Sequence, residues 1–149
     1  MIINLIGQPG SGKTTISEKL NVYVPKYIKI DGDELRSILS NKDYSENGRR
    51  RNIQTAYNIA LFLEKKGFTP VISLVSPYRD LREWLKNQTE VFEFYIKTSE
   101  IRGRENFFVE DFEEPIDNFS LIDTTNKDAF DIVKNHIKPI ITSYIQKVY

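Results

Sequence analysis

Apolar and polar positions along the chain form two alternating kinds of segment. Short apolar runs rich in β-branched residues predict strands, and several of these runs are nearly continuous, as is typical of strands covered on both faces. Between the runs, apolar residues recur at helical spacing, most clearly from about residue 49 to residue 66, where Gly67 follows as a C-cap. The predicted strands are Ile2–Ile6, Tyr27–Ile30, Val71–Val75, Phe92–Ile96 and Ser120–Ile122.

Predicted helices separate these strands, and two further segments have no regular pattern. Alternation of strands and helices with short connections predicts a parallel sheet flanked by helices. The expected fold class is therefore a three-layer α/β/α arrangement around a five-stranded parallel sheet, formed as one domain by residues 1–149. The irregular segments, Asn41–Gly48 and Arg102–Asn118, are expected to act as lids. The predicted helices are Thr14–Leu20, Asp33–Leu39, 49–66, Asp80–Asn87 and Lys127–Val148, the last bent at Pro139.

The composition excludes several classes of function. Lys and Arg number 21 and Asp and Glu also number 21, so no overall positive field attracts nucleic acid or an anionic membrane. The absence of cysteine excludes disulfides, thiolate catalysis and a Cys-based zinc site. The first apolar run has five residues and no basic leader, which is typical of a strand and not of a signal peptide or membrane span. We therefore expect a cytoplasmic protein with small-molecule partners, and the possibility of a homodimer stays open.

A phosphate-binding loop follows the first predicted strand. The octet Gly7-Gln8-Pro9-Gly10-Ser11-Gly12-Lys13-Thr14 is a full G-x-x-x-x-G-K-T motif between a strand and a helix. Backbone N–H groups of such a loop point at phosphate oxygens, Lys13 adds a positive charge there, and Thr14 offers a hydroxyl to Mg²⁺. We therefore predict ATP and Mg²⁺ as ligands. The residues expected to contact ATP are Gly7, Gly10, Ser11, Gly12, Lys13, Thr14 and Thr15.

A second group of polar residues follows the second and third predicted strands. Asp31 and Asp33 come where the second strand ends, at the edge where an open parallel sheet binds ligands. A carboxylate there can hold Mg²⁺ or accept a proton from an attacking hydroxyl, although Asp33 can also serve as the N-cap of the next helix. Several arginines around one crevice indicate an anionic second substrate. The other candidates on this side are Arg36, Tyr44, Arg49, Asn52, Ser76 and Arg79.

Four spaced motifs in this order resemble adenylylsulfate kinase, also called APS kinase. They are G-x-x-G-S-G-K-T-T at Gly7–Thr15, D-G-D-x-x-R at Asp31–Arg36, [FY]-S-x-x-x-R-x-x-N-I at Tyr44–Ile53 and S-P-Y-R-x-x-R at Ser76–Arg82. The resemblance covers most of the first hundred residues. It implies the P-loop nucleoside-triphosphate hydrolase fold of kinase type. It also implies transfer of the ATP γ-phosphate to the 3′-hydroxyl of adenosine 5′-phosphosulfate, a step of sulfate assimilation.

The same resemblance implies roles for individual residues. Lys13 and Thr14 would serve ATP and Mg²⁺, Asp33 would lie at the acceptor hydroxyl, and Asp31 would help to organise the metal. Lys13 and Asp33 are therefore the predicted catalytic residues. Tyr44 would stack on the adenine of the acceptor. The remaining predicted acceptor contacts are Arg36, Arg49, Asn52, Ser76 and Arg79.

The resemblance ends after Thr98, in a shortened lid at about residues 99–118. Family members carry R-D-x-K-G-L-Y and F-T-G stretches before a Y-E-x-P motif, whereas this chain passes directly to Phe112-Glu113-Glu114-Pro115. Arg102 and Arg104 supply lid charge or are solvated, and Phe107 and Phe108 either stack on a ligand or pack in the core. Three hypotheses follow: an APS kinase, a related kinase for another nucleotide, nucleoside or sugar hydroxyl, and an ATP-binding regulatory module without transfer activity. The acidic pair Asp31 and Asp33 argues against the third.

Overall fold

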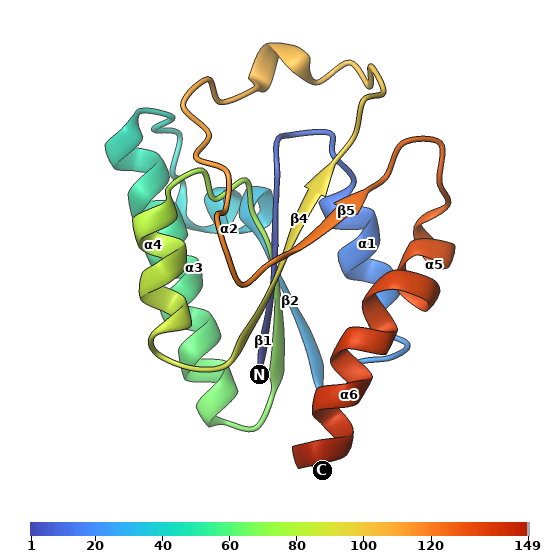
Figure 1. Cartoon of the computed structure of the whole chain (residues 1–149). Coiled ribbons are helices and arrows are strands. Elements are labelled where there is room, and N and C mark those ends of the chain that lie inside the picture. The colour runs from blue at the N-terminus through green and yellow to red at the C-terminus, as the bar shows by residue number, and fades with distance from the viewer. Residues whose placement is uncertain (149) are drawn as a thin grey trace.

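One parallel sheet with strand order β2-β3-β1-β4-β5 forms the centre of the molecule in a computed structural model that describes residues 1–148 (Figure 1). Each neighbouring pair of strands is parallel, which confirms the fold class expected from the sequence. The strands are β1 (Ile2–Ile6), β2 (Tyr27–Asp31), β3 (Thr69–Ser73), β4 (Val91–Lys97) and β5 (Ser120–Asp123).

Helices cover both faces of this sheet. Figure 1 shows α3 and α4 on one face and α1, α5 and α6 on the other. The helical elements are α1 (Lys13–Leu20), α2 (Gly32–Leu39), α3 (Glu46–Lys65), α4 (Arg79–Lys86), the short 3₁₀ turn η1 (Glu105–Phe107), α5 (Ala129–Ile132), the π-helical turn η2 (Val133–Ile137) and α6 (Lys138–Val148).

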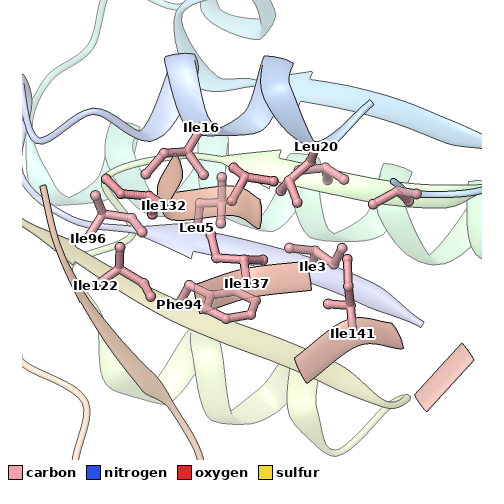
Figure 2. Packing of buried hydrophobic residues seen from close by; sticks show 13 residues of the cluster. Ile3, Leu5, Ile16, Leu20, Phe94, Ile96, Ile122, Ile132, Ile137 and Ile141 are labelled. Atoms are coloured by element: carbon pink, nitrogen blue, oxygen red, sulfur yellow. The ribbon is translucent and has the colours of Figure 1, made fainter. Parts of the chain in front are cut away.

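Alternating side chains of the strands build two separate cores. Ile3 and Leu5 of β1 belong to the core under α1, α5 and α6, which Figure 2 shows, while Ile2 belongs to the core under α2, α3 and α4. Successive strand residues point to opposite faces, so a strand covered on both sides must be apolar throughout. Burying one such side chain contributes about 1.5–3 kcal/mol. The apolar residues of β1, interrupted only by the buried Asn4, therefore fix the strand that precedes the phosphate-binding loop.

The third strand begins and ends earlier than the sequence predicts. It spans Thr69–Ser73, whereas the apolar run predicts Val71–Val75. The strand includes Pro70, although proline removes a ladder donor. It is tolerated because pairing with β1 begins only at Val71. Val75 and Ser76 are consequently free to leave the sheet and line a cavity.

Two predicted helix boundaries also need correction. Helix α3 begins at Glu46 and not at 49, because the Ser45 hydroxyl caps it by accepting a hydrogen bond from the Gly48 amide at 3.3 Å. The last helical region begins at Ala129 and not at Lys127, and the π-helical turn η2 interrupts it just before Pro139. A proline inside a helix lacks a donor and clashes with the carbonyl four residues earlier, and the wider π turn accommodates this.

The carboxyl ends of the strands meet at one edge of the sheet, and the segment between β4 and β5 crosses above them (Figure 1). The connections after β1, β2 and β3 therefore face a common space. Within residues 1–148, no helix combines the length and apolar character needed to cross a membrane.

Candidate active site

The phosphate-binding loop joins β1 to α1 in the strand–loop–helix context that the motif requires. Gly12, at the N-cap of α1, has a φ of 110°, which a side chain would strain. Gly7 lies so close to β4 that a Cβ would come within 2.3 Å of the Ile96 carbonyl oxygen. No side chain caps the amino end of α1, so its N–H groups stay available for an anion.

Lys13 lies in this loop as a buried cation. Its Nζ donates to the Gln8 carbonyl at 2.9 Å and to the Ser11 hydroxyl at 3.4 Å. Burial lowers the pKa of Lys13 from 10.5 to about 8, while the carboxylates Asp33 and Asp31 act in the opposite direction. The nearby carboxylates therefore offset only part of the cost of burying this positive charge, and phosphate oxygens would offset more of it.

Nucleotide binding is expected to make Lys13 take up a proton. Phosphate oxygens favour the charged form, so the pKa of Lys13 rises from about 8 towards its ordinary value when a nucleotide binds. About half a proton should be taken up per site at pH 8, and close to none at pH 6.5, where Lys13 is charged in both states. Calorimetric titration with a non-hydrolysable ATP analogue in buffers of different ionisation enthalpy measures this uptake. Equal binding enthalpies in all buffers at pH 8 would contradict the prediction.

Two carboxylates from the end of β2 have separate tasks. Asp31 caps α2 by accepting a hydrogen bond from the Glu34 amide at 3.1 Å, so the alternative that Asp33 is the N-cap is wrong. Asp31 also accepts a hydrogen bond from the Thr14 hydroxyl at 3.3 Å. Asp33 lies in the first turn of α2, and its carboxylate is exposed and makes no hydrogen bond or ion pair within residues 1–148. Capping by Asp31 thus leaves the Asp33 carboxylate free for a ligand.

A cavity of about 450 Å³ lies over the carboxyl ends of β1, β2 and β3. Every predicted acceptor residue except Arg79 lines it, and so do part of the phosphate-binding loop and three residues of the lid. The lining residues that the sequence predicts are Gly10, Lys13, Thr14, Asp31, Asp33, Arg36, Tyr44, Arg49, Asn52 and Ser76. Gly7, Ser11, Gly12 and Thr15 do not line this cavity and complete the loop beside it.

The expected place of Arg79 needs correction. Its guanidinium donates to the Glu114 carbonyl from Nη2 at 2.8 Å and from Nε at 3.2 Å. The Glu113 side chain accepts a hydrogen bond from the Arg79 amide at 2.8 Å. Arg79 therefore fastens the end of the lid to the start of α4 and does not line the cavity.

The arginines that line the cavity differ in how many hydrogen bonds their guanidinium groups already make within the protein. Arg36 donates from Nη1 to the carbonyls of Asn41 and Asp43 at 3.2 and 3.0 Å, and lies 4.2 Å from the centre of the Tyr44 ring. It thereby holds Tyr44, a residue that is 62% exposed, at the edge of the cavity. The Arg49 guanidinium makes no hydrogen bond or ion pair among the described residues. Asn52 is buried with its Oδ1 unpaired. Arg49 and Asn52 are thus the polar groups best placed to receive a ligand.

The shortened lid is tied to the phosphate-binding loop. The Gln8 side chain pairs with the backbone of Val109, donating to its carbonyl at 2.8 Å and accepting from its amide at 2.9 Å. Arg104 and Phe107 line the cavity, with the guanidinium 5.5 Å from the ring centre. Arg102 instead bonds the carbonyls of Gly10 and Thr124 and pairs with Glu100, and Phe108 does not line the cavity. Of the residues left open by the sequence, only Arg104 and Phe107 face the acceptor space.

Sequence reasoning missed the contact between Gln8 and Val109. Gln8 occupies a variable position of the phosphate-loop motif, and no pattern links it to a residue 101 positions later. The one hint in the sequence was the expectation that residues 102–118 form a lid near the nucleotide.

Gln8→Ala is expected to loosen the lid. The change removes both hydrogen bonds to Val109 while leaving the Gln8 carbonyl, which Lys13 contacts, in place. Deuterium uptake of peptides covering residues 102–111 should rise about fivefold or more in rate, as expected for roughly 1 kcal/mol per hydrogen bond. Gln88→Ala is the matched control, since within residues 1–148 the Gln88 side chain bonds only the Trp84 carbonyl on α4. Unchanged lid exchange in Gln8→Ala would contradict the assigned role.

Comparison with known proteins adds the family. A family model described as adenylylsulphate kinase matches residues 1–106. The chain belongs to the adenylylsulphate kinase family. It is accordingly a P-loop kinase that transfers a phosphoryl group to a hydroxyl acceptor, which removes the alternative of a regulatory module without transfer activity.

Two curated relatives align over different lengths of this family member. Cytidine diphosphoramidate kinase of Campylobacter jejuni is 31% identical over 91% of this chain and 85% of its own length. A probable adenylyl-sulfate kinase of Archaeoglobus fulgidus is also 31% identical, over 61% of this chain and only 62% of its own length. The alignment with the first relative leaves out less than a tenth of the chain, so it includes the lid.

Solved structures support the fold. The Mycobacterium tuberculosis APS kinase, solved in complex with AMPPNP and APS, aligns with a TM-score of 0.76 over 93% of this chain and 96% of that chain. At 16% sequence identity, this likeness shows the fold alone.

Proposed function

We propose that this member of the adenylylsulphate kinase family transfers the γ-phosphate of ATP to a ribose hydroxyl of cytidine diphosphoramidate. The observation that carries the proposal is the extent of the alignments. The relative named for cytidine diphosphoramidate aligns over 91% of the chain, whereas the family model stops at residue 106. An alignment over 91% of the chain includes the lid, and this supports an acceptor like that of the first relative. The family's reaction favours the 3′-hydroxyl as the site of transfer.

The charges around the cavity support an acceptor with a diphosphate-like group. Arg49 has no partner within residues 1–148, and Arg104 reaches the same space from the lid. Guanidinium groups match the geometry of phosphate oxygens. The exposed rings of Tyr44 and Phe107 line the cavity and offer apolar faces for a nucleobase.

The proposed reaction uses residues from both sides of the cavity. The loop amides and Lys13 hold the β- and γ-phosphates and stabilise the charge of the loose transition state. Asp33 orients the acceptor hydroxyl and accepts its proton. The Thr14 hydroxyl and the Asp31 carboxylate, 3.3 Å apart, are the oxygen ligands that Mg²⁺ prefers, and the ion would neutralise phosphate charge there.

APS is the second candidate acceptor. The family model and the four motifs up to Arg82 favour it. The cavity contains every APS-type contact predicted from those motifs except Arg79. What disfavours APS is the lid, which retains neither the lysine nor the F-T-G segment of the family.

A competition of the two acceptors tests the proposal. ADP release is measured with purified protein, ATP and Mg²⁺, using cytidine diphosphoramidate or APS at equal concentration, and the product is located by ³¹P NMR. We expect a kcat/KM at least about tenfold higher for cytidine diphosphoramidate, and none for its 3′-deoxy analogue. Lys13→Ala serves as the control for contaminating kinases. Preference for APS would establish the second candidate instead. If neither acceptor stimulates ADP release, both candidate acceptors are ruled out.

A further inference from the structure

Ser76 lies in a strained conformation at the wall of the cavity. It follows the end of β3, immediately precedes Pro77, and has a φ of 48° although it is not glycine. Such a conformation is strained and persists only where neighbouring groups hold it. The residue is 1% exposed, so these neighbours come from the interior of the molecule.

One of these neighbours is a buried arginine that the proposed reaction does not use. Arg82 of α4 is 1% exposed, and its Nη1 donates to the Ser76 carbonyl at 2.7 Å. Its Nη2 donates to the Glu113 carbonyl, on the segment that returns from the lid. Glu93 of β4 lies below it, with Oε2 at 4.0 Å from Nε. Burying a guanidinium is costly unless it is paired, so this arrangement holds Ser76 and Glu113 together.

The Ser76 hydroxyl is held by a second set of interactions. Asn4 of β1 donates from Nδ2 to the Tyr57 hydroxyl at 3.2 Å, and Tyr57 donates to the Ser76 Oγ at 3.1 Å. Burial raises the pKa of Tyr57 to about 12, so the phenol stays protonated as a donor. Because the Ser76 oxygen accepts from Tyr57, its own proton is left to point into the cavity.

We propose that Tyr57 and Arg82 are positioning residues, which fix the Ser76 hydroxyl as a hydrogen-bond donor to an anionic oxygen of the acceptor. Arg82 holds the Ser76 backbone in its left-handed conformation, and Tyr57 sets the direction of the hydroxyl. The anionic oxygen belongs to a phosphate or sulfate group of the acceptor. The inference rests on the acceptor cavity of the proposed function, and it deepens that function by assigning roles to two buried residues outside the cavity.

A double-mutant cycle tests the inference. Tyr57→Phe keeps the buried ring and removes only the hydroxyl, so we expect the acceptor KM to rise about fivefold, the effect of one hydrogen bond of roughly 1 kcal/mol. The KM for ATP should stay within about twofold, because the ATP loop is untouched. In the Ser76→Ala background, Tyr57→Phe should have no further effect on the acceptor KM. Additive effects, or an equal rise in the KM for ATP, would overturn the proposal.

Two further variants separate positioning from general destabilisation. Tyr95→Phe is the matched control: Tyr95 is also buried, its hydroxyl bonds Glu114, and it does not line the cavity. It should leave both KM values unchanged. Arg82→Lys keeps the charge but cannot bond both carbonyls, so the acceptor KM should rise while the KM for ATP does not. A rise in the acceptor KM of Tyr95→Phe equal to that of Tyr57→Phe would refute the specific role.

A binding experiment decides the inference independently of the acceptor's identity. Inorganic sulfate is titrated into the ADP complex, and the Ser76 amide resonance is followed by NMR. Sulfate should bind Tyr57→Phe about fivefold more weakly than the wild type. Equal sulfate binding would overturn the inference even if cytidine diphosphoramidate proves to be the acceptor. Weaker binding would support it even if neither proposed acceptor is phosphorylated.

Discussion

We expect Asp33→Asn to slow phosphoryl transfer by about 10³-fold while ATP affinity stays within about twofold of the wild type. Asparagine has the same size and can still contact a hydroxyl, but it cannot accept the proton that the hydroxyl loses. The change does not disturb α2, because Asp31 and not Asp33 caps that helix. Asp33 has no hydrogen-bond partner within residues 1–148 that the substitution would leave unpaired.

Glu34→Gln is the matched control for Asp33→Asn. Glu34 is also exposed in the first turn of α2, yet its side chain does not line the cavity. The control removes the same negative charge near the same helix end, so it should retain most activity. Turnover is measured by ADP release, and affinity by calorimetry with a non-hydrolysable ATP analogue. Normal turnover of Asp33→Asn would show that the carboxylate takes no part in proton transfer.

The sequence predicts the sheet and the phosphate-binding loop because both depend on local patterns. A short, mostly apolar and β-branched run such as Ile2–Ile6 is typical of a doubly covered strand, and the glycine-rich loop after it has a fixed backbone shape. Because the carboxyl ends of parallel strands share one edge, residues after β2 and β3 meet above the loop. For this reason Asp33, Arg49 and Ser76 line one cavity although they are far apart in sequence.

The errors lie where a distant contact decides the local structure. Arg79 follows β3 just as Ser76 does, but its guanidinium turns to the Glu114 carbonyl because the end of the lid packs against α4. Whether Arg104 faces the cavity depends on the fastening of Val109 by Gln8, which no periodicity reveals. The bounds of β3 and of the last helical region differ from the expected ones because the pairing partner of a strand and the widening of a helix turn are tertiary effects.

The second large effect is expected for Lys13→Ala, which should weaken ATP binding by at least about tenfold and reduce kcat/KM by more than about 10³-fold. Lys13 is the only charged residue of the loop Gly7–Thr14, so we expect both binding and transition-state stabilisation to be lost. Lys19→Ala is the matched control, because Lys19 lies on the same helix in its last turn, exposed and away from the cavity.

Thermal unfolding shows whether Lys13→Ala loses ATP binding and activity because the contact to phosphate is gone or because the protein misfolds. The pKa of Lys13 is lowered to about 8, so below that pH the folded protein holds the charge at a cost in stability that the unfolded chain does not bear. Removing the side chain relieves this cost, and the Tm of the nucleotide-free variant at pH 7 should be at least as high as that of the wild type. The rise in Tm that saturating ATP gives the wild type should then largely disappear. A variant that melts lower without nucleotide, yet is stabilised by ATP as much as the wild type, would show that Lys13 supports the fold and not the phosphates.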